Sequence, residues 1–188
     1  MKNPLKERLK NGERVYGTWL MTNSFEACEI MAYMQPDFIM IDGEHGPFDI
    51  ESAGRFVTAI KSQNCVPLLR VPGCEEDILK RGLDTGAYGV MVPLVNTKEI
   101  AEKAVKFSKY PPTGVRGSGA GRAAMFSLDP SYYATANDEV LVIVQIEHYT
   151  AVENLEEILS VPGIDVAFVG PQDLSMSMGV ATKDDPKR

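Results

Sequence analysis

Short apolar runs alternate along the chain with segments in which hydrophobic residues recur every three to four positions. The runs are apolar at consecutive positions, which is typical of strands buried on both faces of a parallel sheet. The segments between them show the spacing of amphipathic helices. Six strands are expected over 17–21, 37–42, 66–71, 89–95, 139–147 and 165–170. Five helices are expected over 24–34, 49–63, 74–86, 96–110 and 150–160.

This alternation predicts an α/β fold, because parallel strands joined by helices form right-handed crossover units. Two architectures fit six βα units: a doubly wound sheet and a (β/α)₈ barrel of the TIM type. The glycine fingerprint of a dinucleotide-binding sheet is absent after the first strand, where "MTNSF" stands. Polar residues instead follow several different strands, which favours the barrel.

Length qualifies the barrel prediction. The chain has 188 residues, whereas a complete barrel takes about 250. We therefore expect residues 1–188 to form a single barrel domain that stops after about six units. The stretch 111–138 is long for a structureless loop, so local helix or a functional role is expected there.

Composition excludes several classes of protein. The formal net charge is −7, and no cluster of basic residues offsets it, so a nucleic-acid partner is not expected. No apolar run approaches the roughly 20 residues that span a bilayer, and the amino terminus lacks a signal-peptide core. The three cysteines have no metal-binding spacing. Reduced thiols in a cytoplasmic protein without membrane contact are expected.

Polar side chains with catalytic potential stand at the carboxyl ends of four expected strands. In a barrel these ends converge on one mouth, where active sites form. The residues are Asp42, Glu44, His45, Arg70, Gln145, Glu147 and Asp173. By contrast, no lysine stands at such a position, so a Schiff-base mechanism is not indicated.

Two of the acids form a candidate metal site. Glu147 and Asp173 follow successive strands, and two hard oxygen ligands with water and substrate oxygens suit Mg²⁺ or Mn²⁺. The alternative, equally weighted on spacing alone, is a pair of surface acids, with Asp173 as a helix cap. The glycine-rich stretch 114–123 could cradle an anion through backbone amides. An ordinary loop is the favoured reading of that stretch.

His45 and Arg70 are the other two candidates. A histidine can act as a base near neutral pH if a neighbour fixes its tautomer, and Asp42 stands nearby. A loop histidine held by a backbone carbonyl is the alternative. Arg70 would suit a substrate carboxylate or a developing oxyanion, or else a structural salt bridge. His148 is expected to be structural or exposed.

Several stretches together resemble one family, the HpcH/HpaI aldolases, which are class II aldolases of 2-keto-3-deoxy and 4-hydroxy-2-oxo acids. The resemblance extends from about residue 17 to residue 179. It is carried, in order, by "FIMIDGEHGPFD", "VPLLRVPG", "LDTGAYGVMVPLVNTKEIAEKAV", "YPPTGVRGSG", "VIVQIE" and "VGPQDLS".

The resemblance implies a divalent-metal lyase that cleaves 4-hydroxy-2-oxo acids into pyruvate and an aldehyde. By motif, Glu147 and Asp173 would bind Mg²⁺, Mn²⁺ or Co²⁺, and Arg70 would hold the enolate oxygen. His45, oriented by Asp42, would be the base. The remaining implied roles are substrate binding by Gln145, Gly170 and Gln172, and contact with a neighbouring subunit's site by Asp84.

The resemblance also implies a homo-oligomer and two further βα units that this sequence lacks. A fragment, a chain whose gap a partner covers, and a truncated relative are the expected explanations. Two other functions stay open: a citrate-lyase β-subunit type of acyl-CoA lyase, and a non-catalytic, oligomer-forming relative. The acidic chain gives little sign of the basic surface that the CoA nucleotide favours. Glu44 has no assigned role.

Overall fold

A computed structural model describes residues 2–180 and shows one parallel sheet of six strands in the order of the sequence. Every strand expected from the apolar runs is present, although several are shorter than the runs. The fourth, for example, ends before Pro93. The strands are β1 (Gly17–Leu20), β2 (Phe38–Asp42), β3 (Val66–Arg70), β4 (Gly89–Val92), β5 (Leu141–Ile146) and β6 (Val166–Val169).

Helices connect the strands as the sequence predicts. Ser24 caps α2 through a hydrogen bond from the backbone N–H of Ala27, and Gly86 ends α4 in the left-handed conformation, at φ +89°. The helix expected over 150–160 is divided at Asn154. The helices are α1 (Pro4–Lys10), α2 (Phe25–Tyr33), α3 (Ile50–Lys61), α4 (Glu76–Asp84), α5 (Lys98–Ser108), α6 (Tyr132–Glu139), α7 (Tyr149–Glu153), α8 (Leu155–Leu159) and α9 (Pro171–Ser177).

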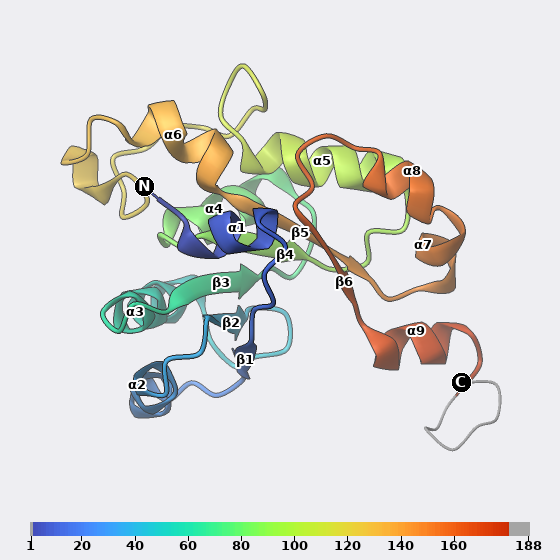
Figure 1. The fold of residues 1–188 in the computed structure, drawn as a ribbon, viewed down its shortest axis with the longest axis horizontal. Helices are drawn as coiled ribbons and strands as arrows, with labels where there is room; N and C mark the ends of the chain where they lie inside the picture. Colours follow the sequence, from blue (N-terminus) through green and yellow to red (C-terminus); the bar gives the residue numbers. More distant parts are fainter. Residues whose placement is uncertain (1, 181–188) are drawn as a thin grey trace.

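The sheet curls into a half-barrel (Figure 1). Each strand pairs with its neighbours in sequence, and β1 and β6 form the two edges. Within residues 2–180 the sheet does not close, because β1 and β6 do not pair with each other. This agrees with the expected stop after about six units, and a complete (β/α)₈ barrel is not formed by these residues. The side chains of β1 and β6 still approach across the concave side, where the rings of Trp19 and Phe168 lie 5.9 Å apart.

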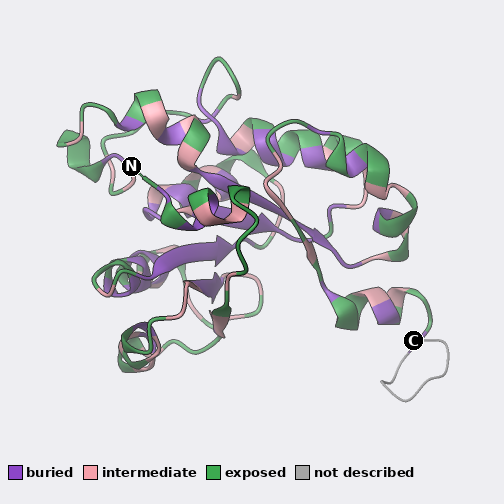
Figure 2. Cartoon of the chain, viewed as in Figure 1, coloured by how far each residue is buried: buried purple, intermediate pink, exposed green. Residues whose placement is uncertain are grey.

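Two apolar layers hold this sheet. The larger one lies between the strands and the surrounding helices, and the smaller one fills the concave side of the half-barrel. Strands β3, β4 and β5 are buried along their whole length (Figure 2). A cavity of about 220 Å³ remains on the concave side, lined by apolar residues such as Met40, Leu68 and Phe168.

The helix α1 was not expected from the sequence. Asn3 caps it through the backbone N–H of Lys6, and Pro4 stands at its first position, which is a recognised start signal. Leu5 and Leu9 pack against the apolar layer of the concave side. The helix thus covers the end of the half-barrel at which the strands begin.

The stretch 111–138 contains local helix, as its length suggested. It forms a 3₁₀ turn, Met125–Ser127, and most of α6. It also buries Arg116 completely, with the guanidinium carbon 4.6 Å from the ring centroid of Tyr110. The glycine-rich part is therefore anchored to the domain by a buried arginine.

Two buried lysines meet beside the amino end of β5. The Nζ atoms of Lys6 and Lys109 lie 2.9 and 2.8 Å from the carbonyl oxygen of Val140. Lys6 also pairs with Asp165 at 2.9 Å. Burial and the nearby charge of Lys6 lower the pKa of Lys109 to about 8. This end is opposite the carboxyl ends of the strands, so neither lysine serves a Schiff base there.

Lys109 should make stability depend on pH in the alkaline range. Its pKa in the folded chain is about 8, below the ordinary value of 10.5, so the unfolded chain binds more protons between these values. Relative to the variant Lys109→Met, we expect the free energy of unfolding of the wild type to rise by about 3 kcal/mol from pH 8 to 10.5. Urea denaturation at several pH values measures this. Burial also raises the pKa values of the thiols of Cys28, Cys65 and Cys74, which lowers the stability of both proteins alike above pH 9. The difference between the two proteins is therefore the test, and parallel curves would contradict the expectation.

Candidate functional site

An ion pair between Asp42 and Arg70 lies at the carboxyl ends of β2 and β3. The sheet register places these residues side by side. The Nε and Nη2 atoms of Arg70 donate to the two carboxylate oxygens of Asp42 at 2.9 and 2.7 Å. The guanidinium carbon also lies 4.7 Å from the ring centroid of Trp19. The salt bridge, which the sequence left open as the alternative for Arg70, is thus formed, and it fixes the guanidinium plane.

Both members of this pair are buried. Burial alone would raise the pKa of Asp42, but the hydrogen bonds and charge of Arg70 outweigh it and lower the pKa. Backbone N–H groups of His45 and Glu44 donate to the same carboxylate and act in the same direction. Asp42 is therefore a permanent anion that holds both Arg70 and the turn that follows β2.

This turn carries Glu44 and His45. Glycines at 43 and 46 are required, because a Cβ there would lie 2.6 Å from the carbonyl oxygen of Arg70 and 2.3 Å from that of Asp42, respectively. The expected hydrogen bond between the side chains of Asp42 and His45 is not formed. Asp42 instead contacts the backbone of His45, since its carboxylate is occupied by Arg70.

The His45 side chain is 61% exposed, and its Nε2 lies 3.9 Å from Glu44 Oε2. Glu44, which the sequence left unassigned, also approaches Arg70, with 2.9 Å between its Oε2 and Nη1. The three residues therefore form a charged cluster at the mouth. Within this cluster, the carboxylate nearest to the His45 imidazole is that of Glu44.

Glu147 follows β5 and is buried at the same mouth. Its Oε1 accepts a hydrogen bond from the backbone N–H of Leu94 at 2.9 Å, and its Oε2 accepts one from Gln145. Burial raises its pKa, and the negative charges of Glu44 and Asp173 add to the rise. The mouth thus holds more negative charge than its cations balance.

Asp173 lies in the first turn of α9, directly after β6, and is exposed. Gly170 precedes that helix, and a Cβ at this position would lie 2.8 Å from Glu147 Oε2. The backbone at 170 therefore passes directly over the Glu147 carboxylate. Gln172 is exposed on α9. The structure thus brings Glu147, Gly170 and Asp173 to one side of the mouth.

The structure also shows the positions of Asp84 and His148. Asp84 accepts a hydrogen bond from Arg116 at 2.7 Å and is partly exposed, so it lies at the surface of its own chain. His148 caps α7, and its Nδ1 accepts the N–H of Thr150 at 3.2 Å. The structural role expected for His148 is confirmed.

Sequence reasoning missed the contributions of Trp19 and Leu94. Trp19 stacks on Arg70, and the Leu94 amide binds Glu147. A tryptophan in a strand gives no sign of which cation it will meet. Leu94 has a positive φ of 51°, a conformation that is uncommon for leucine and often occurs at functional sites. That signal appears only in the structure.

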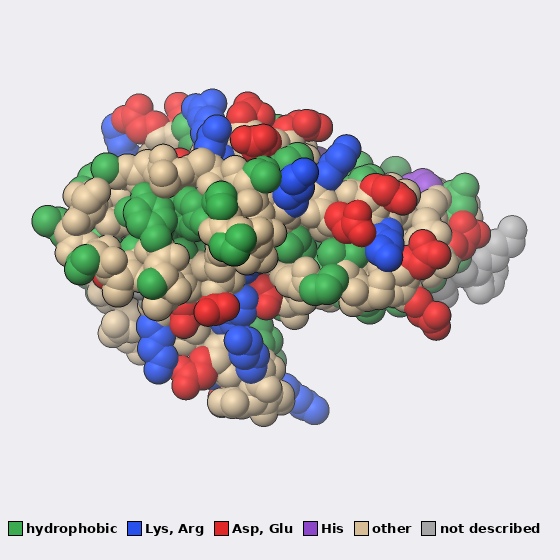
Figure 3. All heavy atoms as spheres, turned by 90° about the horizontal axis from the view of Figure 1, so that it is seen from above, with side chains coloured by type: hydrophobic (Ala, Val, Ile, Leu, Met, Phe, Trp, Pro, Cys, Tyr) green, Lys and Arg blue, Asp and Glu red, His purple; other side chains and the backbone are tan. Residues whose placement is uncertain are grey.

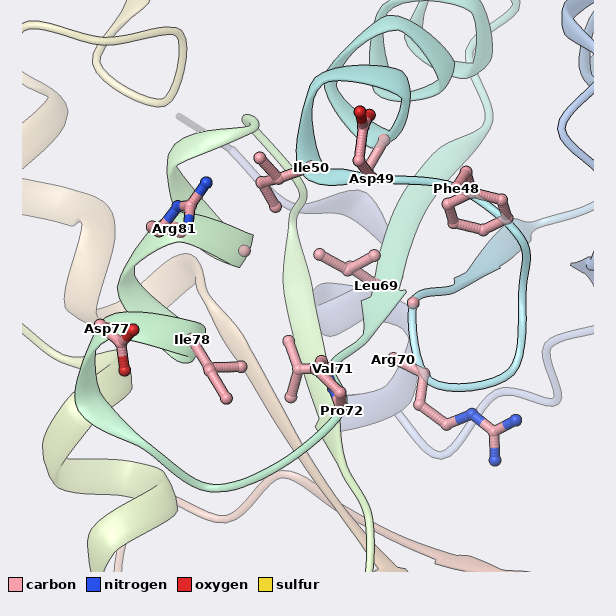
Figure 4. Close-up of a pocket in the computed structure, with 13 residues that line it drawn as sticks. Phe48, Asp49, Ile50, Leu69, Arg70, Val71, Pro72, Asp77, Ile78 and Arg81 are labelled. Carbon is pink, nitrogen blue, oxygen red and sulfur yellow. The ribbon is translucent and has the colours of Figure 1, made fainter.

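An apolar pocket of the helix layer lies away from this mouth. A cavity of about 350 Å³ lies between α3 and α4, with Leu69 and Val71 of β3 among its lining residues. Figure 4 shows the apolar side chains of Leu69, Val71 and Ile78 turned toward this space, while the Arg70 guanidinium points away from it. The charged cluster and the pocket therefore occupy opposite sides of β3.

In the described part of the chain, 2–180, no three or more His, Cys, Asp and Glu side chains are grouped as metal ligands. The site expected from the sequence has two carboxylates. Over the same range, no helix combines the length and apolar character needed to cross a membrane. The cysteines of this range, Cys28, Cys65 and Cys74, are free thiols.

Comparison with known proteins gives consistent matches. The family model described as HpcH/HpaI aldolase/citrate lyase matches residues 15–187. A 2-keto-3-deoxy-L-rhamnonate aldolase from Klebsiella pneumoniae is 42% identical over 181 residues, which is 95% of this chain and 68% of the relative. A hydroxypyruvate/pyruvate aldolase from Roseobacter denitrificans is 40% identical over 94% of this chain and 70% of its own.

A crystal structure shows the same agreement in three dimensions. It is that of an HpcH/HpaI aldolase/citrate lyase family protein from Burkholderia cenocepacia J2315. The two chains superpose with a TM-score of 0.94 at 38% identity, over 99% of this chain and 76% of that one. The half-barrel is thus shared with a solved member of the family.

Proposed function

Because the chain belongs to the HpcH/HpaI aldolase/citrate lyase family, we propose that it is a metal-dependent carbon–carbon lyase. It would cleave 4-hydroxy-2-oxo acids into pyruvate and an aldehyde. The observation that carries the proposal is the convergence of a fixed arginine, Arg70, and a buried carboxylate, Glu147, on one mouth. Retro-aldol cleavage leaves negative charge on the oxygen of a pyruvate enolate, and that oxygen needs fixed positive charge.

The residues present fit a divalent cation. Glu147 and Asp173 would hold it, since carboxylate oxygens are the ligands that Mg²⁺, Mn²⁺ and Co²⁺ accept. Burial and like charges raise the pKa of Glu147, and Gln145 Oε1 is a buried acceptor without a hydrogen-bond partner. A cation would offset the negative charge around Glu147 and would give Gln145 Oε1 a partner. When bound, it would supply Lewis-acid stabilisation of the developing oxyanion.

Arg70 would supply the fixed charge of the protein. Asp42 occupies Nε and one hydrogen of Nη2, so the guanidinium cannot rotate away. Nη1, which faces Glu44 instead of Asp42, is the nitrogen left to meet the substrate oxygen. Gln145 and the backbone at Gly170 and Gln172 would bind the rest of the pyruvate part, close to Glu147.

His45 would move the proton. Its exposed imidazole would take the proton of the C4 hydroxyl as the C3–C4 bond breaks, which releases the aldehyde and leaves the enolate of pyruvate. Protonation of the enolate at C3 then gives pyruvate. Asp42 would assist through the backbone N–H of His45, which fixes the position of the turn.

Asp84 would contact the site of a neighbouring subunit, as the resemblance implies. Arg116 holds one of its carboxylate oxygens, and the side chain is 41% exposed. A second subunit could therefore reach it without breaking this ion pair.

A cleavage assay tests the proposed reaction. The protein is incubated with Mn²⁺ and a series of 4-hydroxy-2-oxo acids, and with 2-keto-3-deoxy-L-rhamnonate, the substrate named for one relative. We expect pyruvate or another 2-oxo acid and an aldehyde in equal amounts, and no product with a chelator. Cleavage of an acyl-CoA ester alone would support the acyl-CoA lyase alternative instead.

The substitution Gly170→Ala should weaken metal binding. The added Cβ would lie 2.8 Å from Glu147 Oε2 and 3.1 Å from Gln145 Nε2, so the carboxylate must move. We expect the affinity for Mn²⁺ to fall at least about tenfold, as for other changes that displace a metal ligand. Calorimetric titration measures this. Gly119→Ala, which meets no atom within 4 Å, is the control, and equal affinities for the two variants would contradict the expectation.

A further inference from the structure

The turn between β4 and α5 holds a leucine in the left-handed backbone conformation. This turn comprises residues 93–97, and Leu94 within it has a φ of 51°. Its sequence, "PLVNT", contains no glycine, the residue that adopts a positive φ without steric cost. A strained conformation of this kind persists only where the surrounding structure enforces it, and such residues cluster at functional sites.

Packing of the side chain does not account for this conformation. Leu94 is 50% exposed, and it lines an open pocket of about 250 Å³ together with Glu44 and Pro72. A half-exposed leucine gains only part of the stabilisation that full burial would give, so apolar packing offers little compensation for the strain. The backbone of the turn is therefore the feature to explain.

The turn is anchored on both sides of Leu94. The N–H of Val95 donates to the carbonyl oxygen of Gln145 at 3.3 Å, and the side-chain amide of Asn154 donates to the carbonyl oxygen of Asn96 at 2.9 Å. α5 follows with its apolar residues buried, and acidic and basic side chains lie over the region where Figure 1 places α5 and α8 (Figure 3). On the other side, β4 is buried within the sheet.

Between these anchors, the φ of Leu94 determines where its N–H points. This angle relates the peptide plane that carries the N–H to the next plane, which is bonded to Gln145. At 51° the N–H donates to Glu147 Oε1 at 2.9 Å. The second oxygen, Oε2, accepts from the side-chain amide of Gln145. Both carboxylate oxygens are thus held, and each retains a lone pair that can face a cation.

We propose that Leu94 is a positioning residue for Glu147, and that its left-handed backbone sets the affinity of the mouth for a divalent cation. The inference rests on the proposed function, in which Glu147 holds that cation. Leu94 acts through the carboxylate, because its N–H orients Oε1 before a cation arrives. Hydrogen-bonded partners of metal ligands commonly contribute about 10–100-fold to affinity in this way.

Two substitutions of Leu94 separate backbone conformation from side-chain packing. Leu94→Ile keeps the apolar volume, but its branched Cβ opposes a positive φ. Leu94→Gly removes the side chain and accepts the conformation. We expect Leu94→Ile to weaken Mn²⁺ binding by about 10–100-fold and Leu94→Gly to retain the wild-type affinity, as measured by calorimetric titration. A side chain needed only for packing would give the reverse order. That order, or equal affinities, would overturn the proposal.

Gln35→Ile is the matched control. Gln35 has nearly the same φ, 52°, and is exposed. It precedes β2, at the end of the sheet opposite the mouth. Urea denaturation should show a similar loss of stability in Gln35→Ile and Leu94→Ile, since a branched Cβ strains both turns. Mn²⁺ affinity should fall only in Leu94→Ile. A similar fall in Gln35→Ile would show that strain anywhere in the fold weakens the site, which contradicts the proposal.

Amide hydrogen exchange without metal, followed by NMR, tests the contact itself. We expect the N–H of Leu94 to lose its protection in Glu147→Ala, whereas the N–H of Val95, which bonds to a backbone carbonyl, stays protected. Unchanged protection of Leu94 would overturn the proposal. A wild type that binds no Mn²⁺ would instead overturn the proposed reaction, and the exchange result would then still decide whether Leu94 holds Glu147.

Discussion

Replacing Arg70 with methionine is expected to slow the exchange of pyruvate methyl protons with solvent by about 10²–10³-fold, the usual cost of losing one oxyanion donor. The guanidinium is held by Asp42 and stacked on Trp19, so no neighbouring cation can take its place. The substitution should also lower the free energy of unfolding by about 3–5 kcal/mol, since the buried Asp42 carboxylate loses its partner. Proton NMR of pyruvate and urea denaturation measure the two effects.

The control is the double variant Asp42→Asn/Arg70→Met. Asparagine still accepts the backbone N–H groups of Glu44 and His45, and no buried charge remains. Stability should largely return, whereas exchange should stay slow. Recovery of exchange together with stability would show that Arg70 acts only through the fold.

Glu147→Gln is expected to reduce Mn²⁺ affinity by about 100-fold or more, because a charged ligand becomes a neutral amide. Without metal, the same substitution should not lower the free energy of unfolding. Burial and the charges of Glu44 and Asp173 raise the pKa of Glu147, so the stability that this group contributes at low pH is lost as pH rises above its ordinary value of 4.5. At neutral pH the neutral glutamine should therefore be no less stable than glutamate.

The site can accommodate this glutamine. Its carbonyl oxygen can keep the bond from the Leu94 N–H. Gln145 can then turn its amide, so that its unpartnered Oε1 accepts from the new side chain. Thermal denaturation with and without Mn²⁺ distinguishes the two effects: the metal should raise the melting temperature of the wild type only. A variant that is less stable without metal would contradict this interpretation of Glu147.

The strands and the position of the site could be predicted from the sequence. Buried parallel strands are apolar at every position, so runs such as 66–71 are distinct from the helices beside them. In such a sheet, polar residues that follow strands share one edge. This is why Asp42, Arg70 and Glu147 were expected together, and they lie together.

Partner choice within the site could not be predicted. Asp42 is three residues from His45 but pairs with Arg70, because the register of β2 and β3 brings their backbones side by side. A bidentate pair with a guanidinium then outcompetes a bond to an exposed imidazole. Register depends on the packing of whole strands, so spacing along the chain does not reveal it.

The remaining differences have a similar origin. α1 lies in a charged segment whose two leucines matter only because a concave apolar surface lies beneath them. The 3₁₀ turn Met125–Ser127 has three residues with positive φ and no glycine to mark them. In both places tertiary contacts, and not local preference, determine the backbone.

The exchange of pyruvate methyl protons in D₂O, followed by NMR, tests the proposed enolate chemistry most directly. It needs no knowledge of the aldehyde and depends on Arg70, Glu147 and Asp173 together. We predict exchange with Mn²⁺ and none with a chelator. Equal rates in the two conditions, or no exchange in either, would contradict a metal-dependent pyruvate lyase.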